Sequence, residues 1–120
     1  MRILVCGSRY WTDRDIIREA LELQPRDSVV VHGAARGADR IAGEVARELG
    51  MAVQEYPADW HLYGRKAGMI RNQAMLVPAP DIVLAFTSNL PTSRGTADMV
   101  ARARSRNIPV MIFGEATGGR

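Results

Sequence analysis

Short apolar runs alternate along this chain with segments whose apolar positions recur every three to four residues. The runs fall at 2–6, 28–32, 51–56, 81–86 and 109–113 and are rich in Val, Ile and Leu. Continuous apolar runs of this kind are typical of strands buried on both faces, as in a parallel sheet. The pattern therefore predicts five buried strands.

Four helices are predicted between these strands. The first is capped by Thr12 or Asp13, has inward apolar positions from Ile16 to Leu23, and ends at Pro25. The second covers 38–49 and stops at Gly50, because glycine favours the left-handed conformation that ends a helix. The third is predicted from about 64 to 76 and the fourth from about 97 to 107, while 58–63 is predicted as an aromatic-rich loop.

Because strand and helix alternate throughout, the fold class is predicted as α/β, with helices on both faces of a five-stranded parallel sheet. The expected strand order is 3-2-1-4-5, which places a switch point between strands one and four. We expect one domain over 1–113 and a flexible C-terminal tail over 114–120. Ligands in such sheets bind beyond the carboxyl ends of the strands at the switch point.

The composition excludes several classes of site and structure. The 120 residues carry a formal charge of +3, which is compatible with nucleic acid but too small to require it. The single cysteine, Cys6, excludes an internal disulfide framework, and with two histidines it cannot complete a zinc site, so no metal or cofactor is expected. No apolar run approaches the roughly 20 residues needed to cross a bilayer, and Met1 leads straight into a strand, so a cytoplasmic location is expected.

The stretch from Thr92 to Asp98 lies between a predicted strand and a predicted helix. The first N–H groups of a helix have no internal partner, and the helix dipole adds positive potential there. Thr92, Ser93 and Thr96 add hydroxyl groups, Gly95 lets a ligand approach the backbone, and Arg94 adds a cation. These features suit a phosphate or another anion. Alternatively, the stretch is a polar turn before a helix capped by Thr96.

Two further loops are delivered to the same sheet edge. One is Gly7-Ser8-Arg9; the other runs from Gly33 to Asp39 and includes Arg36 and Gly37. Neither has the glycine spacing of a dinucleotide motif or the Lys-Ser/Thr pair of a P-loop, so hydrolysis of ATP with magnesium is disfavoured. Asp39 either complements a helix dipole or accepts a hydrogen bond from a ribose. Helix starts near 38, 64 and 97 are expected to point at one site.

The third predicted helix carries a stripe of Gly64, Gly68, Arg71 and Met75 at helical spacing. The stripe fits close approach of a ligand or close packing against another helix, as in a dimer. Beside it, Asn72 either contacts a base or ribose or holds a loop. Trp60 either stacks on a base or covers the core.

Together these motifs resemble the YspA-like, cpYpsA-related branch of the SLOG superfamily, which also contains the LOG phosphoribohydrolases and the DprA/Smf DNA-processing proteins. The resemblance extends from Arg2 to Phe113 and rests on Gly7-Ser-Arg with Trp11, His32-Gly-Ala-Ala-Arg-Gly-Ala-Asp39, Pro57-Ala-Asp-Trp60, Tyr63-Gly-Arg-Lys-Ala-Gly68, Arg71-Asn72 and Arg94-Gly-Thr96. It implies a Rossmann-like domain that binds nucleotides or derivatives such as ADP-ribose, and that forms homodimers or larger homo-oligomers.

The resemblance also bears on catalysis. Arg71 lies where the LOG enzymes have an arginine, and Gly95 and Thr96 match their Gly-Thr pair, but Met99 stands in place of their glutamate. A thioether cannot exchange a proton, and Asp98 is about 100° away around the helix, so the hydrolytic machinery is incomplete.

We therefore favour binding or sensing of a nucleoside phosphate or an ADP-ribose-like ligand. The alternatives are hydrolysis of the N-glycosidic bond of a nucleoside 5′-monophosphate, with Arg71 as the catalytic residue, and binding of single-stranded nucleic acid through the arginine loops and Trp60. The candidate ligand-binding residues are Gly7, Ser8, Arg9, Gly33, Arg36, Gly37, Asp39, Trp60, Arg71, Asn72, Ser93, Arg94, Gly95 and Thr96.

Overall fold

The computed structural model of this chain describes residues 1–115 and contains one sheet of five parallel strands in the order β3-β2-β1-β4-β5. Each strand pairs in parallel with its neighbours, and β1 pairs with both β2 and β4. The predicted α/β class and strand order are therefore confirmed. The strands are β1 (Arg2–Gly7), β2 (Val29–His32), β3 (Ala52–Glu55), β4 (Ile82–Phe86) and β5 (Val110–Phe113).

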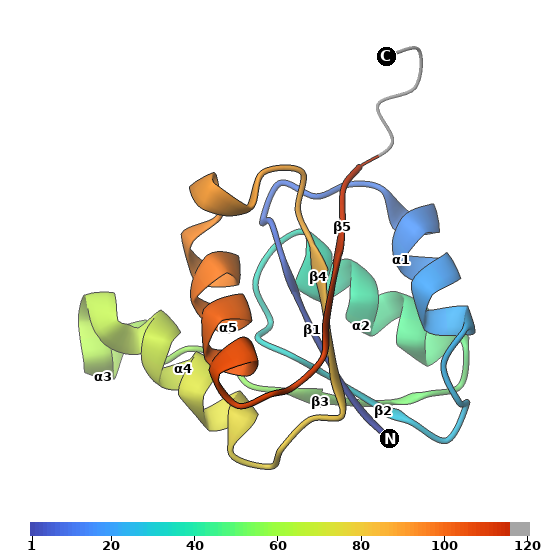
Figure 1. Cartoon of the computed structure of the whole chain (residues 1–120), viewed down its shortest axis with the longest axis horizontal. Coiled ribbons are helices and arrows are strands. Elements are labelled where there is room, and N and C mark those ends of the chain that lie inside the picture. The colour runs from blue at the N-terminus through green and yellow to red at the C-terminus, as the bar shows by residue number, and fades with distance from the viewer. Residues whose placement is uncertain (116–120) are drawn as a thin grey trace.

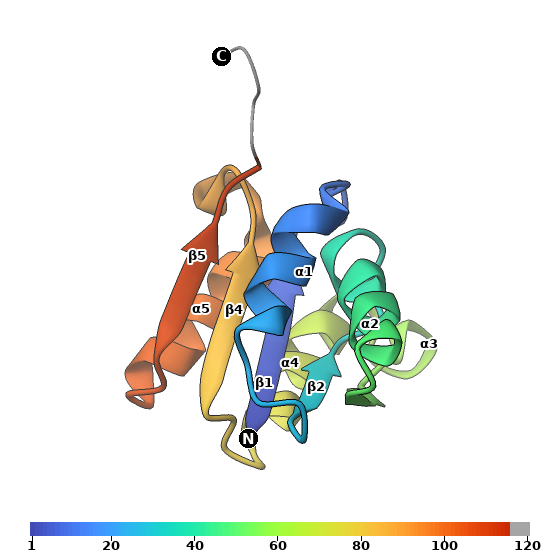
Figure 2. The ribbon, with the colours of Figure 1, turned by 90° about the vertical axis from the view of Figure 1, so that its right-hand side faces the viewer.

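Helices cover both faces of the sheet. Figure 2 shows α1 (Arg14–Glu22) and α2 (Ala38–Glu48) in front of the strands, with α4 (Ala67–Leu76) and α5 (Arg94–Ser105) behind them. The short helix α3 (Trp60–Tyr63) and the 3₁₀ turn η1 (Gly64–Lys66) precede α4, and a second 3₁₀ turn, η2 (Leu90–Thr92), precedes α5. Within the described residues, none of the helices has both the length and the apolar character that crossing a membrane requires.

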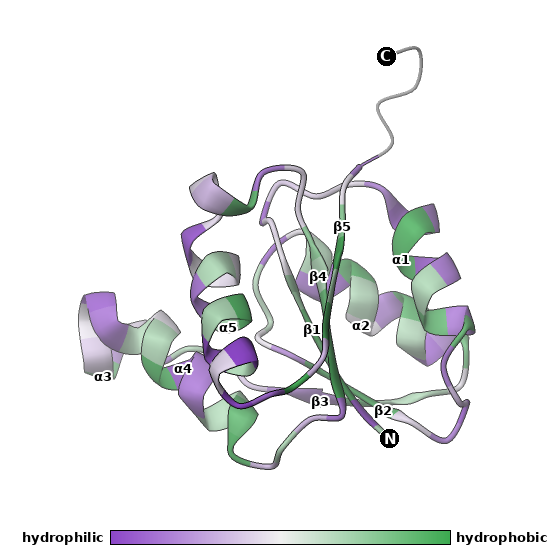
Figure 3. Ribbon diagram, viewed as in Figure 1, coloured by the Kyte–Doolittle hydropathy of each residue, from purple (hydrophilic) through white to green (hydrophobic). Residues whose placement is uncertain are grey.

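The core has two parts, one on each face of the sheet. Along β1, Ile3 and Val5 contribute to the cluster under α1 and α2, whereas Leu4 and Cys6 contribute to the cluster under α4 and α5. This alternation follows from the two-residue period of a strand. Apolar colouring accordingly runs along β4 and β5 in Figure 3, while the edge strand β3 is largely hydrophilic and exposed.

The ends of α1 and α2 test three predictions. Asp13 is the N-cap of α1, since its Oδ1 accepts a hydrogen bond from the Ile16 N–H at 3.2 Å. Gly50, at φ +79°, follows the end of α2 as predicted. Leu23 is 84 % exposed, so its predicted inward position is wrong: α1 ends at Glu22, and Leu23 lies beyond the last helical turn.

The segment before α4 differs from its prediction. Residues 60–63 form a helical turn rather than a loop, because Asp59 Oδ1 accepts a hydrogen bond from the Leu62 N–H at 2.9 Å. The predicted helix start at Gly64 is wrong, since Gly64 has φ +56° and lies in η1, and α4 begins only at Ala67.

The last helix begins three residues earlier than predicted, at Arg94 instead of 97. Thr96 therefore lies inside the first turn of α5, and the prediction that it caps this helix is wrong. Of the predicted tail, Glu115 donates its N–H to Ser88 Oγ at 3.0 Å, while 116–120 lie outside the described residues.

Gly7 holds three elements together at the carboxyl end of β1. A Cβ atom at this position would lie 2.6 Å from Ala38 Cβ and even closer to the Phe86 carbonyl oxygen, and real Cβ atoms do not approach heavy atoms so closely. The absence of a side chain at Gly7 thus lets α2 and β4 close around the end of β1.

We predict that Gly7→Ala lowers the free energy of unfolding by about 1–3 kcal/mol, because the added methyl group forces α2 or β4 to move. Urea unfolding measures this change. Gly95→Ala is the control, since a Cβ there meets nothing within 4 Å. Equal unfolding free energies for wild type and Gly7→Ala would contradict this account of the packing.

Candidate ligand-binding cleft

A cleft of about 540 Å³ lies beyond the carboxyl ends of β1 and β4, at the predicted switch point of the sheet. Its walls come from the loop after β1, the loop before α2, one side of α4 and the start of α5. It is lined by Cys6, Gly7, Ser8, Arg9, Tyr10, Ala35, Asp39, Arg71, Asn72, Met75, Thr92, Ser93, Arg94, Gly95 and Thr96. Residues from the three predicted loops therefore meet in one place.

The start of α5 carries no side-chain cap. Ser93 occupies the N-cap position, but its hydroxyl donates to the Asn89 carbonyl oxygen at 3.1 Å and lies 2.7 Å from Thr87 Oγ1. The first intrahelical bond runs from the Ala97 N–H to the Ser93 carbonyl. The amide groups of the first turn therefore lack an intrahelical or side-chain acceptor, and this end of the helix faces the cleft.

Thr96 lies in the same turn and is only 4 % exposed. Its hydroxyl takes part in none of the side-chain hydrogen bonds found among residues 1–115, although the residue lines the cleft. Thr96 thus offers a donor or acceptor to a molecule in the cleft.

The start of α2 differs, because protein groups already occupy it. The Ala38 N–H donates to the Ser8 carbonyl oxygen at 3.1 Å, and the carboxylate of Asp39 lies in the first turn. A first-turn acid offsets the positive potential of a helix start. An anion in the cleft is therefore attracted to α5 rather than to α2.

Asp39 is almost completely buried and closes the loop before α2. Its Oδ2 accepts hydrogen bonds from the Gly33 N–H at 3.1 Å and the Ala35 N–H at 3.2 Å. Burial raises the pKa of Asp39 to about 6, although these two hydrogen bonds and the Arg71 charge oppose the rise. The carboxylate thus has a structural task in the loop and also borders the cleft.

Arg71 is held against the opposite side of that loop. Its Nη1 donates to the Gly33 carbonyl oxygen at 2.6 Å, and its Nε donates to Asn72 Oδ1 at 3.0 Å. A Cβ at Gly33 would lie within 2.6 Å of the Arg71 Cζ, so a glycine is what allows the guanidinium to rest there. Arg71 therefore enters the cleft as a positioned charge.

Asn72 joins α4 to α5. Besides accepting from Arg71, its Nδ2 donates to the Gly95 carbonyl oxygen at 3.2 Å and to Asp98 Oδ2 at 3.0 Å. Asp98 is itself bound by the Arg102 Nε at 2.9 and 3.0 Å. Of the two predicted alternatives for Asn72, the contacts favour the structural one, because the buried amide already holds the start of α5 in place.

The rim of the cleft carries an aromatic side chain that the sequence analysis did not select. Tyr10 follows Arg9, whose guanidinium carbon lies 5.2 Å from the Tyr10 ring centroid. The Tyr10 N–H donates to Ser8 Oγ at 3.0 Å. Its place directly after Gly7-Ser-Arg was the available signal. Cys6 and Ala35 also line the cleft without having been predicted, whereas Thr92 and Met75 belong to the predicted anion stretch and to the predicted helix stripe.

Four of the predicted site residues do not line the cleft. Gly33 is covered by the Arg71 guanidinium, and Gly37 lies beneath the backbone of Ser8 and Arg9. The other two point elsewhere: Arg36 is exposed, and Trp60 lies on α3 with its ring beside Gly68. Figure 1 shows α3 at the outer end of α4, away from the strand ends.

The predicted stripe on the third helix is only partly at the cleft. Arg71 and Met75 line it, whereas Gly64 belongs to η1 and Gly68 contacts Trp60. The cleft therefore meets a side of α4 and not its start, so the predicted convergence of three helix starts is wrong for the helix near 64.

Acidic and metal-binding groups in the cleft are few. Met99, which stands where the LOG enzymes have a glutamate, is fully buried in the core under α5. Asp98 does not line the cleft. Among residues 1–115 no group of three or more His, Cys, Asp and Glu side chains is placed to hold a metal ion.

Comparison with known proteins identifies the family of this chain. The model of the YspA, cpYpsA-related SLOG family matches residues 1–63, which include the first two glycine loops. The chain belongs to this family. It is also 42 % identical over 123 residues to the Gene 61 protein of Mycobacterium phage D29, covering 95 % of this chain and 97 % of that protein. No solved structure matches it. Membership of the SLOG family is consistent with a nucleotide-related function.

The raised pKa of Asp39 predicts a pH dependence of stability. Between pH 3.8 and about pH 6 the folded protein retains a proton that the unfolded chain has lost, so this group's contribution to stability is full below pH 3.8 and falls as the pH rises through 6. We expect wild type to lose up to about 1.4 kcal/mol per pH unit across this window relative to Asp39→Asn. The Asn oxygen can accept the same two hydrogen bonds but does not titrate.

Urea unfolding of both proteins at several pH values between 4 and 7 measures this difference. Parallel stability curves for wild type and Asp39→Asn would show that the carboxyl group titrates as in the unfolded chain.

Proposed function

We propose that this SLOG-family protein binds or senses a nucleotide or nucleotide-derived ligand, such as a nucleoside phosphate or an ADP-ribose-like molecule, in the cleft at the carboxyl edge of the sheet. The observation that carries the proposal is the uncapped start of α5. Ser93 stands at the cap position yet turns its hydroxyl to Thr87 and Asn89. The first-turn amides are thereby left for an anion, and helix starts of this kind bind phosphate.

The charges around the cleft also favour a phosphate at the start of α5. Arg9 borders the cleft from the loop after β1 and Arg94 from the start of α5, while Asp39 lies at the start of α2. A phosphate at α5 gains from the helix dipole and from Arg94, whereas a phosphate at α2 would meet the carboxylate. A ribose hydroxyl, in contrast, can donate to the oxygen of Asp39.

Binding without chemistry is the form of this proposal that the side chains favour. Hydrolysis of an N-glycosidic bond needs an acid or a carboxylate at the reacting carbon. The position expected from the LOG enzymes holds the buried Met99, and Asp98 is engaged by Asn72 and Arg102. Arg71 is in the cleft, but among the acids of residues 1–115 only Asp39 lines it, and that carboxylate already accepts hydrogen bonds from its own loop.

The nucleic-acid alternative loses its aromatic component. It joined Trp60 to the arginine loops, but Trp60 lies outside the cleft and is 59 % exposed on α3. A small anionic ligand needs no such extended surface, and a cleft of about 540 Å³ is in the usual size range for a small molecule.

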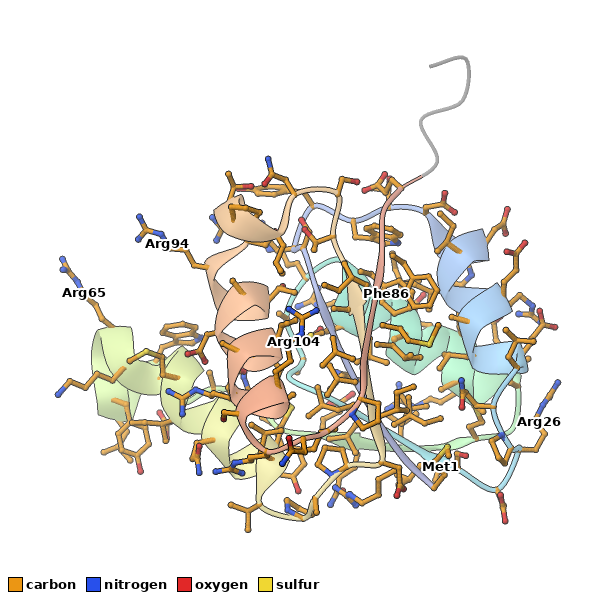
Figure 4. All side chains as sticks on the ribbon, in the orientation of Figure 1. Met1, Arg26, Arg65, Phe86, Arg94 and Arg104 are labelled. Atoms are coloured by element: carbon orange, nitrogen blue, oxygen red, sulfur yellow. The ribbon has the colours of Figure 1, made fainter. Side chains whose placement is uncertain are left out.

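Arg94→Ala tests the place of the phosphate. Arg94 and Arg104 are both exposed arginines of α5, but one is at its start and the other near its end, as Figure 4 shows. We expect Arg94→Ala to weaken AMP binding about tenfold, in line with the loss of a hydrogen bond to a charged group. Arg104→Ala removes the same charge from the far end of the helix and is expected to leave affinity unchanged.

Isothermal titration calorimetry with AMP, ADP-ribose, NAD and cyclic nucleotides measures these affinities, and adenosine serves as the ligand without phosphate. Failure of all these ligands to bind the wild-type protein at millimolar concentration would refute the proposal. Equal effects of the two substitutions would place the phosphate elsewhere.

A further inference from the structure

We infer that Tyr10 is the stacking surface for the flat ring of the ligand, so that the cleft selects phosphorylated compounds that carry a base over phosphorylated sugars. The inference rests on the proposed function and extends it, since it names the chemical group that discriminates between ligands. Nothing in the family match assigns a role to Tyr10.

The exposure of Tyr10 is the first observation. The side chain borders the cleft but is 75 % exposed. An aromatic ring contributes most when it is buried against another apolar surface, and this ring has only the Arg9 guanidinium over it among residues 1–115. The ring is therefore available to a planar partner.

The rigidity of its loop is the second observation. The next residue, Trp11, is fully buried, packs edge-on against Phe86 at 5.6 Å between ring centroids, and donates its indole N–H to the Asp13 carbonyl oxygen at 2.7 Å. On the other side, Ser8 accepts the Tyr10 N–H with its hydroxyl. The backbone of Tyr10 is thus held at the rim by its neighbours, which limits the entropy that the loop loses when a ligand stacks on the ring.

The location of Tyr10 relative to α5 is the third observation. The loop after β1 and the start of α5 lie at the same end of the sheet, as Figure 1 shows, and both line the cleft. One loop offers an aromatic ring beside a cation, and the other offers unpaired amides with Arg94. A molecule with a planar base at one end and a phosphate at the other satisfies both, whereas a sugar phosphate satisfies only α5.

The experiment compares AMP with ribose 5-phosphate, which is AMP without its base, by isothermal titration calorimetry. Wild type is expected to bind AMP at least tenfold more tightly than ribose 5-phosphate. Tyr10→Ala is expected to weaken AMP binding about tenfold, a loss typical of one base–aromatic stack, and to leave ribose 5-phosphate unchanged. Tyr10→Phe keeps the ring and is expected to retain AMP affinity.

Tyr63→Ala is the matched control, since Tyr63 is also an exposed tyrosine but lies on α3, outside the cleft. Its affinity for AMP is expected to equal that of wild type. Thermal unfolding of Tyr10→Ala should match wild type, because an exposed side chain contributes little to the core.

Two outcomes separate this inference from the proposed function. In the first, wild type binds both compounds, and Tyr10→Ala either leaves the affinity for AMP unchanged or lowers the affinities for both compounds equally. Tyr10 then does not contact the base, and the proposed function stands. If wild type binds neither compound nor the other nucleotides, the proposed function fails and this inference fails with it.

Discussion

The hydrogen bond from the Ala38 N–H to the Ser8 carbonyl oxygen joins the loop after β1 to the start of α2, and the rest of the cleft depends on this close approach. It is possible only because Gly7 and Gly37 have no side chains: a Cβ on either would collide with the backbone of the neighbouring loop or strand. With the two loops in contact, Asp39 comes to border the cleft, and Tyr10 is carried to its rim.

The two helix starts at the cleft have opposite electrostatic states. At α2 the Asp39 carboxylate offsets the positive potential and the Ser8 carbonyl accepts the Ala38 N–H, whereas at α5 Ser93 turns its hydroxyl away and no acid lies in the first turn. A stable helix normally gains from a cap, so the missing one costs free energy that a bound anion can restore. This asymmetry gives a ligand a direction, with its negative group at α5.

Polar side-chain contacts hold the wall of the cleft that α4 and α5 form. Asn72 bridges α4 and α5, and Arg71 reaches across to the Gly33 carbonyl, so three separate segments are tied by side chains that also reach the cleft. Removing such a side chain would move the site as well as change its chemistry. Arg71 and Asn72 therefore act first by positioning the walls of the cleft, whereas the start of α5 and the loop after β1 present free groups to it.

The sequence by itself determined the five strands, their order and the edge where the loops converge, because buried parallel strands are continuous apolar runs and their carboxyl ends meet at one edge. Only the tertiary structure decided which side chains enter the cleft. The start of α5 depends on contacts of Ser93 with Thr87 and Asn89, and a local pattern placed it three residues late. Likewise Trp60 and Tyr10 are both aromatics near loops, but α3 directs one beside Gly68 while buried Trp11 holds the other at the rim. These directions depend on which particular groups hydrogen-bond and pack together once the chain has folded, and the apolar periodicity of the sequence does not encode them.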